Sequence, residues 1–227
     1  MNNMQPQTRN DFIASLNAAS PINGLQWPLG EIPVPLSVDG RHYVAGLELN
    51  TQEHLRREQE GLGALTSTGL LHALWELPYG LTFPTRSFKI IDRTTLLNAD
   101  HGWVEERRDG LVRKYQPIGS IRSITVSDKS LTRAVAKAAS HPPTVRRTAI
   151  WFTSTAGASS SAVAALGRAR IIGVGVIAID GTRTIELVAA ADAMRSRPVV
   201  FRWWQAELAY RNWINSREPT GSVEAWD

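Results

Sequence analysis

The stretch from Arg147 to Asp180 constrains the fold more strongly than any other part of the chain. It opens with a short apolar run of β-favouring residues at 150–153, continues as an alanine-rich segment headed by serines at 159–161, and ends in an almost uninterrupted apolar run at 171–179. Serines are favoured at the start of a helix, and a continuous apolar run is typical of a strand covered on both faces. The order strand, helix, strand therefore predicts a βαβ unit with two parallel strands.

The composition excludes several classes of protein. The chain has 227 residues, of which 43% are hydrophobic and 20% charged, so it can bury a core and is not expected to be disordered throughout. It has no cysteine, which excludes a disulfide scaffold, a thiolate zinc site and a cysteine nucleophile. The first residues lack the features of a signal peptide, and no apolar run is long enough to span a bilayer, so we expect a cytoplasmic protein. The net charge of +4 mildly favours an anionic partner.

Capping residues, breakers and hydrophobic periodicity predict further helices and strands. A hairpin is predicted over 36–44, where Asp39 and Gly40 form a turn signal between β-favouring arms. Strands are predicted at 87–92, 103–106 and 111–116, and helices at 12–20, 51–60, 67–77, 129–140, 182–191 and 199–214.

These elements predict an α/β chain in three parts. Residues 1–85 form a mixed N-terminal portion of helices and a hairpin, residues 86–217 form an α/β core with a tryptophan-rich C-terminal helix, and residues 218–227 form a tail. A single domain is the alternative. We expect a mixed sheet that contains the βαβ unit and carries helices on both faces.

The predicted helix over 129–140 places three basic residues on one face. Lys129, Arg133 and Lys137 are spaced i, i+4 and i+8, and Arg146 and Arg147 follow shortly after the helix. Such residues are candidates for nucleic-acid binding, because they would neutralise backbone phosphates. The alternative is an ordinary solvated face of an amphipathic helix.

The order of elements from 90 to 180 resembles the core of the restriction-endonuclease-like, PD-(D/E)XK, nucleases, and in particular their Mrr-type branch. Three local segments carry the resemblance. Residues 98–103, NADHGW, look like the family's approach to its metal-binding acid, and residues 111–115, LVRKY, look like its strand with a catalytic lysine. Residues 150–154, IWFTS, together with the following helix and Ile179-Asp180-Gly181, are similar to the family's closing strand, helix and strand.

This resemblance implies a restriction-endonuclease-like core that acts on DNA. It implies Asp100, Glu105 and Lys114 as the catalytic candidates, and Mg²⁺ as the cofactor if the nuclease site is functional. Val112 departs from the pattern, because the family carries a carboxylate or amide ligand two residues before the lysine. We therefore expect a nucleic-acid-associated protein that is catalytically weak or inactive.

The C-terminal helix indicates a different class of function. Its apolar residues form an arc that is wider than a small domain usually needs, and it includes Trp203, Trp204 and Trp213. The helix either packs over the edge of a sheet or presents these tryptophans to another protein. The alternative function is therefore a non-enzymatic subunit of a larger protein assembly.

Overall fold

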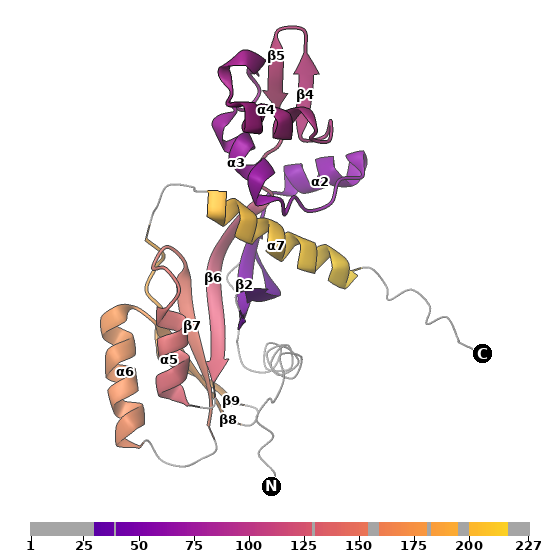
Figure 1. The fold of residues 1–227 in the computed structure, drawn as a ribbon. Helices are drawn as coiled ribbons and strands as arrows, with labels where there is room; N and C mark the ends of the chain where they lie inside the picture. Colours follow the sequence, from indigo (N-terminus) through magenta and orange to yellow (C-terminus); the bar gives the residue numbers. More distant parts are fainter. Residues whose placement is uncertain are drawn as a thin grey trace, which may run out of the picture. The chain divides into compact units, whose positions relative to one another are not determined.

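The computed structural model describes residues 30–38, 40–128, 130–153, 159–180, 183–194 and 200–217. The chain divides into two compact units, each built from two segments of sequence. Unit 1 comprises Met1–Glu48 and Ile121–Ser196, and unit 2 comprises Leu49–Ser120 and Arg197–Asp227. The predicted helix at 12–20 and the predicted tail at 218–227 lie outside the described residues. The two units are described separately below (Figure 1).

Unit 1 is built on a mixed six-stranded sheet with the order β1-β2-β6-β7-β8-β9. The outer pairs β1/β2 and β8/β9 are antiparallel, whereas β6/β7 and β7/β8 are parallel. This confirms an α/β fold with a mixed sheet. The strands are β1 (Glu31–Val38), β2 (Arg41–Leu49), β6 (Gly119–Asp128), β7 (Arg146–Phe152), β8 (Gly175–Asp180) and β9 (Arg183–Val188).

The predicted βαβ unit is confirmed as β7, helix α6 (Ser160–Ile172) and β8. The side chain of Ser159 caps the helix by accepting a hydrogen bond from the backbone N–H of Ala162 at 3.3 Å. The helix ends at Gly173, whose φ of 68° lies in the left-handed region that favours glycine. Ile150 on β7 and Val176 on β8 are fully buried, as expected for central parallel strands.

Helix α5 (Leu131–Ala139) connects β6 to β7. It buries Leu131, Ala134 and Val135 and packs against β7 and α6. The apolar face of the segment at 129–140 is therefore where the sequence pattern predicted it. The hairpin at 36–44 is also confirmed, because β1 and β2 pair in register across Val38 and Arg41.

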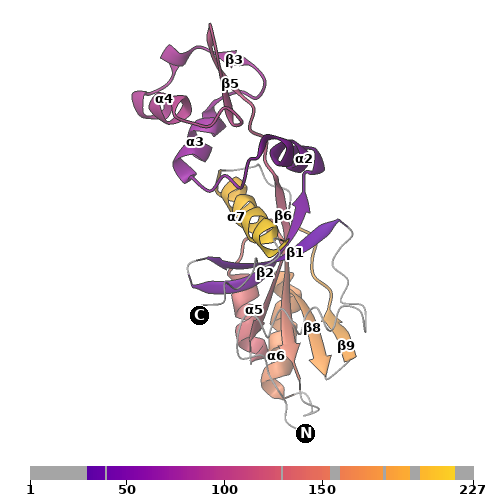
Figure 2. The same cartoon turned by 90° about the vertical axis from the view of Figure 1, so that its right-hand side faces the viewer.

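Unit 2 packs its α-helices with a small antiparallel sheet of order β3-β5-β4 (Figure 2). Its core includes Leu71, Leu74, Leu96 and Tyr115. The helices are α2 (Thr51–Glu60), α3 (Thr68–Glu76), α4 (Ile90–Leu97) and α7 (Val200–Arg217), and the strands are β3 (Thr82–Phe83), β4 (Val104–Arg107) and β5 (Gly110–Arg113).

Helices α2 and α3 confirm the predictions at 51–60 and 67–77, and their caps explain why. The side chain of Asn50 accepts from the backbone N–H of Glu53 at 3.2 Å, and that of Ser67 accepts from Leu70 at 3.3 Å. Strands β4 and β5 confirm the hairpin around the Asp-Gly turn. Gly110 is required there, because a Cβ atom at this position would lie 2.1 Å from the carbonyl oxygen of Phe83.

Two predicted elements are wrong. The segment at 87–92 was predicted as a strand, but α4 begins at Ile90 and buries Leu96 in the core of unit 2. The segment at 182–191 was predicted as a helix, but β9 pairs there with the edge of β8. Short apolar runs do not distinguish helix from strand by periodicity, so packing decided both. Strand β6 was not predicted, although residues 121–126 are rich in β-branched side chains.

The restriction-endonuclease-like core is not confirmed. The strands next to Glu105 and Lys114 belong to the three-stranded sheet of unit 2, whereas the βαβ unit belongs to the six-stranded sheet. None of the helices in the described part of the chain is long and apolar enough to cross a membrane.

Candidate functional site

The structure places Asp100 and Glu105 in two separate local interactions. Asp100 lies in the turn after α4, where its Oδ1 accepts a hydrogen bond from the backbone N–H of Gly102 at 2.7 Å. Glu105 lies on β4 and forms an ion pair with Arg107, with an Nε–Oε1 distance of 2.7 Å. The hydrogen bond from Arg107 lowers the pKa of the Glu105 carboxyl, and the charge of Lys114 acts in the same direction. Both carboxylates are therefore engaged by neighbours on their own short segment.

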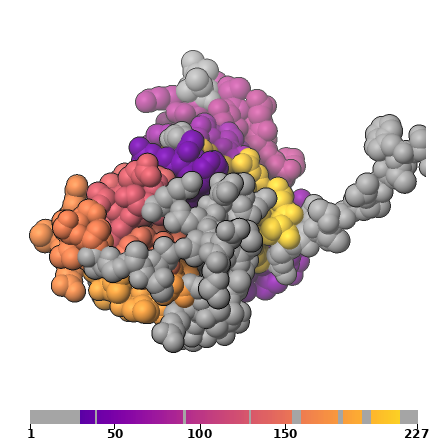
Figure 3. All heavy atoms as spheres, turned by 90° about the horizontal axis from the view of Figure 1, so that it is seen from below, coloured from indigo at the N-terminus to yellow at the C-terminus, as the bar shows by residue number. Residues whose placement is uncertain are grey.

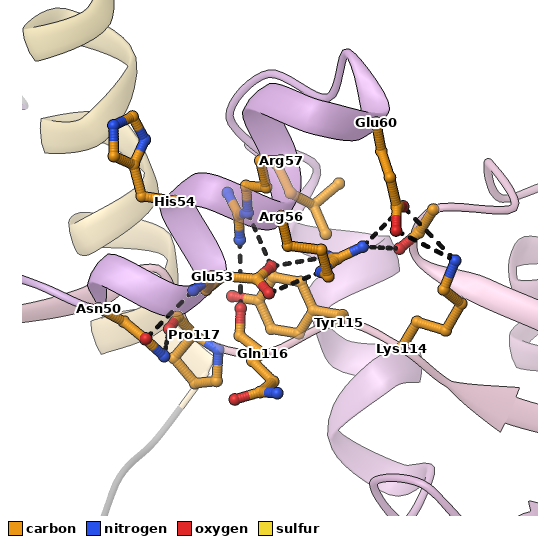
Figure 4. Close-up of polar contacts among 12 residues, drawn as sticks. Asn50, Glu53, His54, Arg56, Arg57, Glu60, Lys114, Tyr115, Gln116 and Pro117 are labelled. Carbon is orange, nitrogen blue, oxygen red and sulfur yellow. Dashed lines mark hydrogen bonds and ion pairs between the residues drawn. The ribbon is translucent and has the colours of Figure 1, made fainter.

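Lys114 lies directly after β5, and its ammonium group faces α2. Its Nζ lies 3.4 Å from Oε2 of Glu60, the last residue of that helix (Figure 4). Its backbone N–H donates to the carbonyl of Trp103 at 3.0 Å. Val112 is buried and pairs with Glu105 across the hairpin. Within the described ranges, no group of three or more His, Cys, Asp or Glu side chains could hold a metal ion.

A buried ionic cluster, formed by Glu53, Arg57 and Glu207, joins α2 to α7 within unit 2. Arg57 donates from Nη1 and Nη2 to the two carboxylate oxygens of Glu207, each at 2.8 Å, and from Nε to Glu53 at 2.8 Å. All three side chains are almost completely inaccessible to solvent. Arg56, which is partly exposed, also donates to both oxygens of Glu53 (Figure 4). Two arginines therefore balance two glutamates.

The remaining hydrogen-bonding groups of Glu207 and Arg57 are also satisfied. Glu207 accepts from the backbone N–H of Leu65 at 2.8 Å and from the hydroxyl of Tyr115 at 3.0 Å. Arg57 donates further to the carbonyl of Gln116 at 3.2 Å. A buried charge pair is tolerated when its geometry is good and its other polar atoms have partners. The buried ionic cluster meets both conditions.

This environment shifts the pKa values of Arg57 and Tyr115. Burial alone would lower the pKa of Arg57, but the hydrogen bonds and charges of Glu207 and Glu53 outweigh it, so the pKa is raised. Burial is the main cause of the raised pKa of Tyr115, and the negative charge of Glu207 adds to it. The Arg57 guanidinium also lies 4.7 Å from the ring centroid of Trp103, a favourable cation–π contact. The cluster therefore holds a permanent charge and a neutral tyrosine in place, which is a structural role.

Sequence reasoning missed the buried ionic cluster, although a signal was present. Glu53 and Arg57 are spaced i, i+4 in a helix that was interpreted only as charged. Glu207 lies four residues after Trp203 and three before Tyr210, and therefore on the apolar seam of α7. An acid on an apolar seam indicates a buried partner of opposite charge.

The side chains of Trp75, Tyr79, Phe201 and Trp204 form what we call the aromatic surface of unit 2. Trp75 is 40% exposed, Tyr79 50% and Phe201 56%, and Trp204 is half-buried. Trp203, only 7% exposed, lies beneath this surface, with its ring centroid 5.1 Å from that of Trp75. The rings of Phe201 and Trp204 are 5.6 Å apart. Figures 1 and 2 both show the start of α7, the helix of Phe201 and Trp204, beside α3, the helix of Trp75.

The three tryptophans predicted to contact a partner therefore lie in different environments. Trp203 belongs to the core of unit 2, whereas Trp204 is only packed against that core. Trp213 lies near the other end of α7, with its ring centroid 5.1 Å from that of His54. Successive residues on a helix point about 100° apart, which explains the difference between Trp203 and Trp204.

Arg113, at the end of β5, contacts two aromatic rings. Its guanidinium carbon lies 5.7 Å from the ring centroid of Tyr79 and 5.6 Å from that of Trp203. Its Nη1 donates to the carbonyl of Leu74 at 2.9 Å, while its Nε is buried without a hydrogen-bond partner. Burial lowers the pKa of Arg113. This side chain differs from Arg57 because no carboxylate of the described residues lies within 4.0 Å of it.

The predicted basic stripe is partly neutralised by an acid of unit 1. Lys129 lies outside the described residues. Arg133 and Lys137 are exposed on α5, and both form ion pairs with Asp128, at 3.0 Å and 2.6 Å. Although partial burial opposes it, the hydrogen bond from Lys137 lowers the pKa of Asp128. The two basic residues therefore share a face, as predicted, but with a carboxylate between them.

Arg146 and Arg147 are neighbours on β7 and have different surroundings. Arg147 donates from Nη2 to the carbonyl of Ile172 at 2.5 Å and from Nη1 to the carbonyl of His141 at 3.3 Å. Arg147 thereby binds the C-terminal end of α6, where a cation is favourable. The charge of Arg146 acts on Glu31, lowering its pKa against the larger opposite effect of burial. Arg147 is therefore engaged in holding the unit together.

Helix α6 adds two arginines that the sequence interpretation did not include. Arg168 and Arg170 are exposed, and α6 contains no acidic residue. Helices α5 and α6 contact each other, and Figure 3 shows their atoms side by side on the surface. We refer to Arg133, Lys137, Arg168 and Arg170 as the basic residues of α5 and α6.

No protein-family model, no curated protein and no solved structure matches this chain.

Proposed function

We propose that this protein functions by binding another protein through the aromatic surface of unit 2. The observation that carries the proposal is the exposure of three large aromatic side chains, Trp75, Tyr79 and Phe201, on a single folded unit. Aromatic residues are enriched at protein interfaces and contribute much of their binding energy. This function corresponds to the interaction subunit that the sequence offered as an alternative.

The buried ionic cluster supports the proposal, because it fixes α7 before any partner arrives. Glu207 on α7 is tied to Arg57 on α2 by two hydrogen bonds of 2.8 Å and to Tyr115 by a third of 3.0 Å. A side chain presented by a rigid element loses less conformational freedom on binding. Phe201 and Trp204 are therefore presented by a helix that is already anchored.

A second function, association with nucleic acid, is favoured by the basic residues of α5 and α6. Four exposed cations on two neighbouring helices suit phosphate contacts, which supply affinity without reading the base sequence. Asp128 weakens this candidate, since it pairs with both Arg133 and Lys137. We rank it second for that reason.

The proposal assigns no catalytic step to Asp100, Glu105 and Lys114. The carboxylate of Glu105 is paired with Arg107, and the ammonium group of Lys114 faces Glu60. Metal-assisted hydrolysis needs oxygen ligands that converge on one ion. Val112, a buried apolar residue, occupies the position of one of these ligands in the resembled nucleases.

The first step in testing the proposed function is to identify the partner protein. The tagged full chain is isolated from its native cells, the co-purifying proteins are identified by mass spectrometry, and each complex is rebuilt from purified components. A variant with Trp75→Ala and Phe201→Ser should lose the rebuilt complex while remaining folded, with only a modest fall in melting temperature, because Trp75 is 40% and Phe201 56% exposed. Ile171→Ser is the matched control, because Ile171 is an 86% exposed apolar residue of α6, which belongs to unit 1. A complex that withstands the double variant would refute the proposal.

A further inference from the structure

Arg113 is an arginine in an apolar setting that lacks a counter-ion among the described residues. It contacts the rings of Tyr79 and Trp203, and it donates a hydrogen bond to the carbonyl of Leu74. Its Nε is buried without a partner. Arg57, in the same unit, has two carboxylates at 2.8 Å. The charge of Arg57 is therefore compensated within the unit, whereas the charge of Arg113 is not compensated by a carboxylate of the described residues.

A cation that is partly removed from water and unpaired retains an unused capacity to bind an anion. Charge-assisted hydrogen bonds between a guanidinium and a carboxylate are among the strongest polar contacts in proteins. The contacts with the rings of Tyr79 and Trp203 restrict the orientation of the guanidinium. The guanidinium of Arg113 can therefore donate hydrogen bonds to a carboxylate of another molecule.

The side chains near Arg113 determine which chemical groups a ligand must carry beside that carboxylate. Tyr79 is 50% exposed and Leu81 65% exposed, and Trp75 contacts the same buried Trp203 that underlies Arg113. The most energetic positions of protein interfaces are enriched in tryptophan, tyrosine and arginine. A ligand for this surface must therefore carry one negative charge flanked by large apolar groups.

We propose that Arg113 is the specificity-determining residue of the aromatic surface and that it binds an aspartate or glutamate side chain, flanked by aromatic or aliphatic residues, in a peptide segment of a partner protein. This inference rests on the proposed function and names the chemistry of the partner. A nucleic acid fits less well, because a nucleic-acid backbone requires several cations, whereas Arg113 is set against large aromatic side chains.

The proposal is tested with a random peptide display library selected against the full-length protein. The enriched peptides should carry Asp or Glu beside an aromatic or aliphatic residue. Changing that carboxylate to the amide in a synthetic peptide should weaken binding about tenfold or more, as expected for a hydrogen bond to a charged group. Arg113→Gln should weaken the binding of the acidic peptide by a similar factor, and it should leave the binding of the amide peptide almost unchanged. Arg108→Gln, in the exposed turn of the β4–β5 hairpin, is the control that should leave both affinities unchanged.

The outcomes separate this inference from the proposed function. Enriched peptides without a carboxylate, whose binding Trp75→Ala abolishes, would overturn the role of Arg113 and leave the aromatic surface as a binding site. Absence of any enriched peptide, together with binding of single-stranded oligonucleotides that Trp75→Ala abolishes, would overturn both. If Arg113→Gln lowers the melting temperature, the carboxylate-to-amide change in the peptide alone decides the question, because it leaves the protein unaltered.

Discussion

Arg57 and Glu207 form a bidentate ion pair between α2 and α7, with both N–O distances at 2.8 Å and both side chains inaccessible to solvent. The pair joins residues that are 150 positions apart in the sequence. It closes unit 2 across its two segments of chain, Leu49–Ser120 and Arg197–Asp227.

Replacing Glu207 with glutamine should strongly destabilise unit 2. The change keeps the size of the side chain but leaves Glu53 as the carboxylate that still pairs with the buried charge of Arg57. Removal of one member of a buried pair costs about 3–5 kcal/mol. The free energy of unfolding from urea denaturation measures the effect. Glu60→Gln is the control, since Glu60 is partly exposed and its ion pairs should contribute less than about 1 kcal/mol. Equal losses of unfolding free energy in Glu207→Gln and Glu60→Gln would contradict the stabilising role of the buried ion pair.

Trp203→Ala and Trp204→Ala should differ, although the residues are adjacent. Trp203 is buried against Trp75 and Tyr115, so its truncation should cost about 3–5 kcal/mol. Trp204 is half-buried, so its truncation should cost about 1 kcal/mol and act mainly on partner binding. Thermal denaturation and binding to the rebuilt complex measure the two effects. A similar loss of stability in both variants, without loss of binding for Trp204→Ala, would make α7 a core helix only.

Stability should fall in alkaline solution because of Tyr115. Burial raises the pKa of Tyr115 in the folded protein, whereas a tyrosine in the unfolded chain ionises at a pH of about 10. Above that pH the folded state holds a proton that the unfolded state has lost, so the free energy of unfolding decreases as the pH rises. Ionisation of this one group lowers the free energy of unfolding by at most about 1.4 kcal/mol per pH unit.

Tyr115→Phe checks this pH dependence, because phenylalanine keeps the ring and cannot ionise. Urea denaturation from about pH 8 to about pH 11 should show a shallower decline for Tyr115→Phe than for the parent protein. Tyr79→Phe, at an exposed tyrosine, is the control for removal of a phenolic hydroxyl. Parallel curves for all three proteins would show that Tyr115 is not the group responsible.

The basic residues of α5 and α6 should account for any affinity for nucleic acid. Replacing all four with glutamine should flatten the dependence of duplex DNA binding on salt, by up to about 0.9 in the logarithmic slope for each phosphate that is no longer neutralised. Stability should change little, because all four side chains are exposed and glutamine has good helix propensity. Binding isotherms at several salt concentrations measure the slope. An unchanged slope would show that these residues are exposed to solvent but do not bind nucleic acid.

The purified protein should not cleave DNA with Mg²⁺ or Mn²⁺. Val112 is apolar and buried, and Glu105 is paired with Arg107. Incubation of plasmid DNA with each metal, followed by electrophoresis, measures cleavage. Metal-dependent cleavage that disappears in both Lys114→Ala and Asp100→Ala would restore an enzyme interpretation.

The sequence by itself determined the elements whose signals are local. Capping by Asn50, Ser67 and Ser159 defined the starts of α2, α3 and α6, because a cap satisfies backbone N–H groups within one turn. The parallel pair β7/β8 followed from its uninterrupted apolar runs. The apolar face of α5 followed from helical periodicity. In each case the signal lies within a short stretch of sequence.

Tertiary structure alone decided the rest, because the controlling contacts join residues far apart in sequence. The segment at Ile90 became a helix through packing of Leu96 in the core, and the segment at Arg183 became a strand through pairing with β8. The sequence showed Glu207 as an acid on an apolar seam, but only the fold identified Arg57 as its partner. Burial likewise separated Trp203 from Trp204, and Arg113 differs from Arg57 because no carboxylate of the described residues pairs with it. The residue type alone determines the charge and hydrophobicity of a side chain. The free energy of a buried charge depends instead on which distant groups the fold brings within hydrogen-bonding distance.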